Sequence, residues 1–200
     1  LTNPINTYTA AGTYTAQLLA ITNNGCRDSV VVPVTMSVII PSVNSGTMCQ
    51  GSSVNLNATG GTSYQWQPAT ALSNTTVANP TANPTSTTIY SVTITNTITG
   101  CVRTLTTQVT VNPKPNADFT FTTNPCGGGV NFTDNSAASI TQWAWDFGNS
   151  QTSTVQNPYQ FYSTGGTYNV TLIAGNAFNC FDTIVKPVTV GNPPPVSVSP

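Results

Sequence analysis

The stretch that decides the fold is residues 157–189, NPYQFYSTGGTYNVTLIAGNAFNCFDTIVKPVT. Residues 3–35 repeat this stretch at a constant shift of 154 positions, with 14 of 33 residues identical and no gap. The same shift carries Pro41 onto Pro195, so the segment after the stretch recurs as well. A fixed period of this kind is typical of a repeat architecture.

The period of 154 residues holds two modules. We expect four pieces: 1–37, the C-terminal part of one module; 38–113, a module of a second type; 114–190, a complete copy of the first type; and 191–200, the start of the next module. The junctions carry Ile40-Pro41, Asn112-Pro113-Lys114-Pro115 and Asn192-Pro193-Pro194-Pro195. Proline favours extended backbone, so the chain is expected to be a semi-rigid array cut from something longer.

Each module shows the period-two alternation of β-strands. Trp143, Trp145 and Phe147 share one face of a predicted strand, and Tyr168, Val170 and Leu172 share a face of another. Clusters of Gly, Asn and Pro separate the strands, and no segment has the pattern of an amphipathic helix. The fold class is therefore predicted to be all-β, with tandem Ig-like β-sandwich modules.

Charge is scarce along the chain, which has four Lys and Arg, five Asp, no His, no Glu and a net charge of -1. Such a chain offers no basic surface for nucleic acid, and no apolar run is long enough to insert into a membrane. Without His, imidazole metal sites and His-based catalytic triads are impossible within it. We expect no enzyme activity, no catalytic residues and no cofactor.

The five cysteines sort by module. Cys49 and Cys101 are expected to pair within one module, Cys126 and Cys180 within the next, and Cys26, which matches Cys180, with a partner before residue 1. Such pairing indicates an oxidising, extracytoplasmic location. Free buried thiols are the alternative, and two cysteines per module supply only half of a zinc site.

Residues 114–190 resemble the PKD domain, an Ig-like sandwich of cell-surface proteins. The resemblance rests on Phe132-Thr133-Asp134, Trp143-Ala144-Trp145-Asp146-Phe147-Gly148, Pro158, Tyr162 and Gly166-Thr167-Tyr168-Asn169-Val170-Thr171-Leu172. Asn149-Ser150 stands where the family usually has Asp-Gly, and Gln160 where it has His. Residues 1–37 match the second half of the same domain.

Residues 38–113 resemble the Ig-like modules that alternate with PKD domains in giant surface adhesins of gliding bacteria. The matching features are Cys49-Gln50-Gly51, Tyr64-Gln65-Trp66-Gln67-Pro68, Leu72, Pro80, Thr88-Ile89-Tyr90 and Gly100-Cys101. The resemblance implies export by the type IX system and a role as a long surface fibre. The structural core is expected to contain Trp66, Tyr90, Trp143, Trp145, Phe147, Tyr162 and Tyr168.

The only carboxylates are those of five aspartates. Asp134 and Asp146 could lie near each other, and turn capping is their expected role. Asp118, Asp134 and Asp146 are weak candidates for calcium, which needs 6–8 oxygen ligands. Otherwise no metal site is expected.

Asp28-Ser29-Val30 and Asp182-Thr183-Ile184 occupy equivalent places in the repeat. They resemble the Asp-Ser/Thr-aliphatic acceptor for O-glycosylation described in this bacterial group. Ser29 and Thr183 are therefore possible glycosylation sites, with an ordinary strand start and a capping Asp as the alternative.

Two functions compete. The first is the shaft of a very long extracellular fibre or adhesin on the cell surface, whose chains self-assemble into a homo-oligomeric filament for attachment, gliding or prey capture. Its partners would be neighbouring modules and identical chains, because near-zero net charge promotes association. The alternative is a carbohydrate-binding or spacer module of a secreted hydrolase, with Tyr159 and Phe161 as the only loose aromatic pair.

Overall fold

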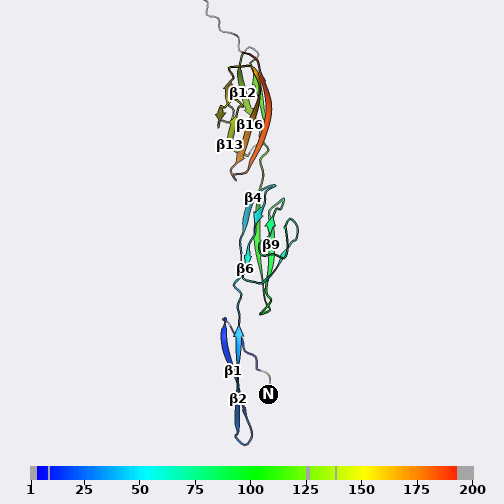
Figure 1. Cartoon of the computed structure of the whole chain (residues 1–200), viewed down its shortest axis with the longest axis vertical. Coiled ribbons are helices and arrows are strands. Elements are labelled where there is room, and N and C mark those ends of the chain that lie inside the picture. Colours follow the sequence, from blue (N-terminus) through cyan, green and yellow to red (C-terminus); the bar gives the residue numbers. More distant parts are fainter. Residues whose placement is uncertain (1–3, 9, 125–126, 138, 193–200) are drawn as a thin grey trace, which may run out of the picture. The chain divides into compact units, whose positions relative to one another are not determined.

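The computed structural model describes residues 4–8, 10–124, 127–137 and 139–192. It is all-β and consists of two tandem Ig-like sandwich modules, which follow a two-stranded hairpin in the chain (Figure 1). By contacts the chain divides into unit 1, Leu1–Thr47 with Ser53–Thr110, and unit 2, Met48–Ser52 with Val111–Pro200. Among the described residues, no helix is long and apolar enough to cross a membrane.

The N-terminal part of unit 1 is an antiparallel hairpin of β1 (Gly12–Ile21) and β2 (Arg27–Met36). Its local geometry repeats that of β16 (Gly166–Asn176) and β17 (Phe181–Val190) in unit 2. The Tyr8 and Tyr14 rings lie 4.3 Å apart, and the Tyr162 and Tyr168 rings 4.2 Å. The repeat in the sequence is therefore a repeat in structure.

The second part of unit 1 is a sandwich built on a sheet in the order β4-β10-β9-β7. Its strands are β3 (Ser42–Val43), β4 (Gly46–Cys49), β5 (Val54–Asn55), β6 (Ala58–Thr59), β7 (Ser63–Gln67), β8 (Thr81–Ala82), β9 (Thr88–Asn96) and β10 (Cys101–Asn112). Trp66 and Tyr90 are fully buried in it. The Trp66 indole donates a hydrogen bond to the carbonyl of Val77 at 2.8 Å, and the Tyr90 hydroxyl to that of Thr70 at 3.1 Å.

Unit 2 packs the sheet β11-β12-β15 against the sheet β14-β13-β16-β17. The strands not yet given are β11 (Phe119–Thr123), β12 (Gly129–Asp134), β13 (Ile140–Asp146), β14 (Thr152–Ser153) and β15 (Tyr159–Phe161). Gly148 has a φ of 72°, and a Cβ there would lie 2.8 Å from the carbonyl oxygen of Asn169. Glycine is therefore required at the end of the Trp143–Gly148 motif.

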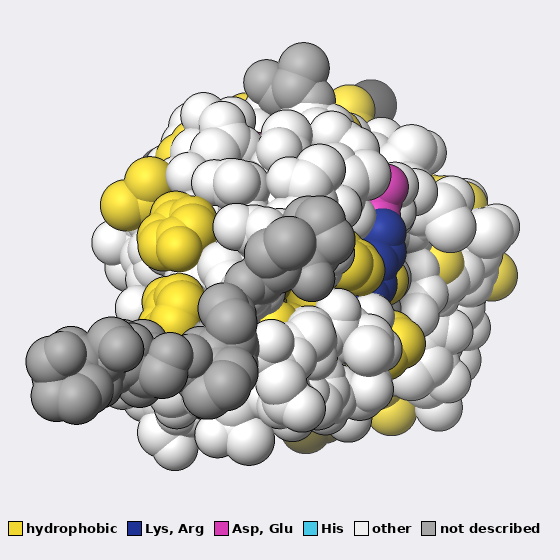
Figure 2. Space-filling view, turned by 90° about the horizontal axis from the view of Figure 1, so that it is seen from above, with side chains coloured by type: hydrophobic (Ala, Val, Ile, Leu, Met, Phe, Trp, Pro, Cys, Tyr) yellow, Lys and Arg dark blue, Asp and Glu magenta, His cyan; other side chains and the backbone are white. Residues whose placement is uncertain are grey.

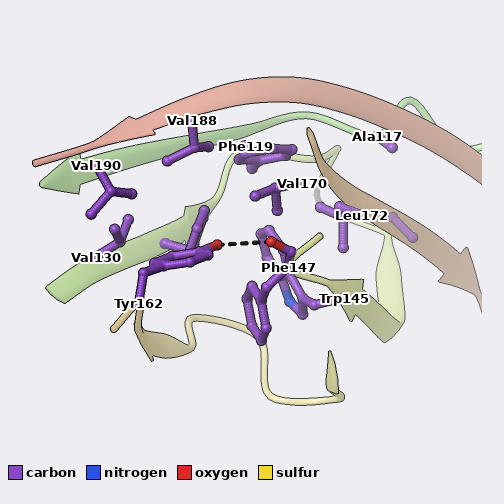
Figure 3. Close-up of a cluster of buried hydrophobic side chains, with 12 residues drawn as sticks. Ala117, Phe119, Val130, Trp145, Phe147, Tyr162, Val170, Leu172, Val188 and Val190 are labelled. Atoms are coloured by element: carbon purple, nitrogen blue, oxygen red, sulfur yellow. Dashed lines mark hydrogen bonds between the residues drawn. The ribbon is translucent and has the colours of Figure 1, made fainter. Parts of the chain in front are cut away.

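Large aromatic side chains fill the space between the two sheets of unit 2 (Figure 3). Trp145, Phe147 and Tyr162 are buried, while Trp143 and Tyr168 are half-buried at the edge of the same cluster. The Tyr162 hydroxyl donates to the Phe147 carbonyl at 3.0 Å. Burial, with smaller effects from Tyr168 and Asp146, raises the pKa of Tyr162 to about 12, so this donor keeps its proton.

Candidate functional site

The disulfide bond of the structure joins Cys49, at the end of β4, to Cys180, directly before β17, with 5.6 Å between the Cα atoms. Pairing within each module, Cys49 with Cys101 and Cys126 with Cys180, is therefore wrong. Cys26 and Cys101 are free thiols, and Cys126 lies outside the described residues.

The length of β10 explains the error. Cys101 begins this strand and Asn112 ends it, while the amide of Gln50, next to Cys49, donates to the Asn112 carbonyl at 2.8 Å. Twelve residues of strand extend about 36 Å at ~3.3 Å per step, and a disulfide needs Cα atoms closer than about 7 Å. Cys49, which ends β4, lies beside the C-terminal end of β10, whereas Cys101 lies at the N-terminal end of β10.

Asn176 shapes the turn that carries Cys180. Its side chain is buried, and its Oδ1 accepts from the amides of Phe178 at 3.0 Å and Cys180 at 3.1 Å. Its Nδ2 donates to the carbonyl of Pro113 at 2.8 Å. One side chain thus fixes the turn beside the disulfide and also holds the proline connector.

The connector, residues 112–117, is held at four points within unit 2. Pro113 and Pro115 have no amide hydrogen, so the segment cannot bond as a regular strand and needs partners from outside. Beyond the bonds to Asn112 and Pro113, the Ala117 amide donates to Asp182 Oδ2 at 2.9 Å. Lys114 Nζ lies 2.7 Å from Asp182 Oδ1. We call this set, Cys49–Cys180 with Gln50, Asn176, Lys114 and Asp182, the connector clamp.

Both oxygens of Asp182 are used in the connector clamp. The hydrogen bond from Lys114 and then the one from the Ala117 amide lower the pKa of Asp182 below its usual value. The carboxylate is therefore ionised at neutral pH, and it orients the start of the PKD-like segment against the first residues of β17.

The calcium candidates do not converge on one site. Asp118 Oδ1 lies 2.6 Å from Lys186 Nζ, and the same ammonium donates to the Phe119 carbonyl. Asp146 Oδ1 accepts from the amide of Gly148 at 2.9 Å, the turn-capping role expected for it. Within the described part of the chain, no three His, Cys, Asp or Glu side chains form a metal-binding group.

Asp134 belongs to a network of its own. Its Oδ1 accepts from the Ser136 amide at 2.9 Å, and its Oδ2 from Trp143 Nε1 at 2.7 Å and Gln156 Nε2 at 3.3 Å. Burial raises the pKa of Asp134, but the hydrogen bonds from Ser136, Trp143 and Gln156 outweigh it, and the pKa is lowered overall. Its role is to hold the half-buried indole at the edge of the core.

The two possible glycosylation sites are exposed. Thr183 lies on β17 between the half-buried Asp182 and Ile184, and Ser29 lies on β2 with its amide bonded to Asp28 Oδ1. The hydroxyl groups of Thr183 and Ser29 belong to exposed side chains outside the core, so an attached sugar would not disturb core packing.

Sequence reasoning missed the pairing of Cys180 and the role of Asn176. The sequence did carry a signal for the role of Asn176 in the turn. Asn176 and Asn96 each begin the turn that precedes a cysteine, and Thr22 begins the turn that precedes Cys26. The role of Lys114 carried no such signal, since it lies 68 positions from Asp182 in the chain.

Comparison with known proteins agrees with this description. A family model described as PKD domain matches residues 112–190. Similar solved structures include the PKD1 domain of Vibrio anguillarum Epp (29% identity, 41% of this chain and 99% of that chain covered, TM-score 0.39). The PKD1 domain of the Vibrio cholerae metalloprotease PrtV is another (34% identity, 38% and 96% covered, TM-score 0.36).

Extracellular domains 3–5 of Drosophila OTK are also similar (14% identity, 90% and 70% covered, TM-score 0.44). No protein with a curated functional description matches the chain significantly in sequence. The PKD match and the disulfide together indicate an extracellular or secreted protein.

Proposed function

We propose that this chain, which carries a PKD domain over residues 112–190, is a structural segment of the shaft of a very long extracellular surface fibre. The connector clamp is the observation that carries the proposal. A covalent bond, an ion pair and a part-buried hydrogen bond secure the proline connector within unit 2. A shaft needs fixed connectors, whereas a flexible tether does not.

The hairpin β1–β2 supports a repeating array. Leu18 is 67% exposed, whereas Leu172, its counterpart in the repeat, is 0% exposed under the β11-β12-β15 sheet. An apolar face of this kind marks an interaction surface. We infer that a segment equivalent to residues 114–156 covers it in the assembled fibre.

The uncharged surface supports association of identical chains into a multi-chain filament. On the face shown in Figure 2, uncharged polar groups and backbone dominate, and basic and acidic side chains occur only side by side. A net charge of -1 gives little repulsion between copies. Such filaments would serve attachment, gliding or prey capture without catalysis, and export by the type IX system follows from the resemblance to adhesins of gliding bacteria.

Electron microscopy of the native protein, taken from the cell surface without refolding, tests the proposal. A sandwich module is about 40 Å long, so two modules should give multi-chain filaments an axial period near 80 Å. Single beaded strings, or short stalks that end in a globular catalytic head, would contradict assembly and identify the modules as spacers.

One observation favours the alternative of a carbohydrate-binding module. Tyr159 is 61% exposed and Phe161 53% exposed, and both line a hollow of about 530 Å³ together with Asn149, Gln151 and Gln160. Aromatic faces and amides suit a sugar, but the counterparts of the two aromatics in the repeat are Ile5 and Thr7. Glycan-array binding that Tyr159→Ala abolishes would support this alternative over the shaft.

A further inference from the structure

Three hairpin turns in the chain are each followed directly by a cysteine. Cys26, Cys101 and Cys180 each follow directly after a residue with positive φ: Gly25 at 80°, Gly100 at 71° and Asn179 at 57°. In each turn the amide of that residue donates to the carbonyl of the residue that begins the turn: Thr22, Asn96 and Asn176. The thiol of Cys26 therefore occupies the position from which Cys180 reaches Cys49, whereas the turn before Cys101 is one residue longer.

The match between Cys26 and Cys180 extends beyond the backbone. The amide of Cys26 donates to Thr22 Oγ1 at 3.1 Å, as the amide of Cys180 donates to Asn176 Oδ1 at 3.1 Å. Asp28 follows Cys26 at the distance at which Asp182 follows Cys180. Cys26 is nevertheless an exposed free thiol in this chain, and no counterpart of Cys49 faces it among the described residues.

We propose that Cys26 forms the same disulfide with the counterpart of Cys49 one period earlier in the array, so that one such bond recurs in every period. The inference rests on the repeating array of the proposed function but not on association between chains. Two thiols lose two electrons and two protons to an extracytoplasmic disulfide oxidant, whose own disulfide is reduced to two thiols.

This pattern would make the shaft inextensible. Tension would enter the period at Cys26, through its disulfide to the preceding period. It would pass along the backbone from Cys26 to Cys49 and then cross the disulfide to Cys180, the counterpart of Cys26. Only residues 26–49 of each 154-residue period then carry load. Fully extended, they span about 80 Å at ~3.5 Å per residue, which is close to the folded length of two sandwiches.

The loaded segment is already extended in the fold, because β2, β3 and β4 make up most of it. Residues 50–179, which contain most of the buried residues of both sandwich cores, lie outside the loaded path. Unfolding of a core under force would therefore not lengthen the fibre as long as the disulfides are intact.

Disulfide mapping of the native protein, digested without reduction, tests the bond directly. We expect the Cys26 peptide to be linked to a peptide equivalent to the one that contains Cys49. A free Cys26 thiol in the native protein, or a bond from Cys26 to any other cysteine, would overturn the inference. Failure to see filaments by microscopy would contradict the assembly proposal but leave this result standing.

A longer chain, residues 38–156 joined ahead of residues 3–200, supplies the missing partner and allows a matched control. Cys26 should bond the added copy of Cys49, and Cys26→Ser should leave that copy as a free thiol. Pulled from both ends, the oxidised chain should show no lengthening when its cores unfold. The reduced chain should gain up to about 460 Å per period, because a period is about 540 Å long when fully extended at ~3.5 Å per residue and about 80 Å long when folded. Equal extension in both states would refute the load path.

Discussion

Leu18 and Leu172, which occupy the same position of the repeat, show that the burial of a side chain depends on the elements packed against it and not on the residue type. Leu18 and Leu172 have the same place in equivalent strands, yet only Leu172 is covered by a second sheet. The physical contribution of each to stability should differ accordingly, because removal of a buried side chain leaves a cavity whereas removal of an exposed one does not.

The two leucines give the first prediction. Leu172→Ala should lower the free energy of unfolding of unit 2 by about 3–5 kcal/mol, the range for buried leucines, and Leu18→Ala should change that of this chain by less than about 1 kcal/mol. Denaturant titration followed by tryptophan fluorescence measures both. Equal effects would mean that the β1–β2 face is already covered in solution.

Asp134 gives a prediction about pH. Its folded-state pKa lies below the unfolded value near 3.9. Its stabilising effect is therefore complete above about pH 4 and is lost as the pH falls through the lower folded-state pKa. Asp134→Asn turns an amide NH₂ toward the Trp143 and Gln156 donors and should cost about 1–2 kcal/mol at pH 7.

The loss should shrink as the pH approaches 2, and thermal unfolding across this range measures it. Asp146→Asn is the matched control, since an asparagine oxygen can still accept from the Gly148 amide. An Asp134→Asn penalty that stays constant with pH would contradict the role of the charged carboxylate.

Thr183 and Ser29 give a prediction about modification. We expect the protein isolated from its natural host to carry sugar on these exposed hydroxyls, and Thr183→Val to remove the mass at that site. Intact mass spectrometry is the measurement. A mass equal to that of the bare chain would dismiss glycosylation.

At the scale of elements, the connector is fixed by its surroundings and not by its own hydrogen bonding. Pro113 and Pro115 have no amide hydrogen to donate to a neighbouring strand. The β16–β17 hairpin instead supplies the Asn176 donor for the Pro113 carbonyl and the Asp182 acceptor for the Ala117 amide. Strands β16 and β17 therefore close the sandwich and also hold the segment by which the chain enters it.

Asp182→Asn should loosen this arrangement. An asparagine oxygen can keep the Ala117 amide, but its NH₂ would then face the Lys114 ammonium, so unit 2 should lose about 1–2 kcal/mol. Hydrogen exchange at the Ala117 amide should become faster. Asp28→Asn, the equivalent change in the β1–β2 hairpin, should have little effect, because Asp28 Oδ1 bonds only the neighbouring Ser29 amide among the described residues.

At the scale of the whole molecule, the proposed association of copies would take place between surfaces of low charge. Ion pairs between copies can contribute little with four cations and five anions in the chain. Association into filaments should therefore change less than about tenfold between roughly 0.05 and 0.5 M salt, because screening acts only on charges.

Light scattering across this salt range measures the effect. Thr106→Glu with Gln108→Glu, both on exposed positions of β10, should introduce repulsion and make association strongly salt-dependent. Association of the unmodified chain that weakens steeply with salt would show that charge pairing drives it.

The sequence by itself determined the repeat, the all-β class and the aromatic core. These features follow from local patterns: a constant period, alternation of apolar residues and the Trp143–Gly148 motif, each readable along a few neighbouring residues. Burial of Trp66, Tyr90 and Trp145 follows because such large apolar surfaces leave water wherever a partner sheet exists.

Only the tertiary structure decided which residues far apart in the chain meet. Cysteine spacing within a module was similar, 52 and 54 positions, and favoured pairing inside each one. The length of β10 separates Cys49 from Cys101, while the hairpin turn brings Cys180 to Cys49 across 131 positions. Strand length and turn direction are properties of the folded chain, and they, not spacing in the sequence, set the distance that a disulfide must bridge.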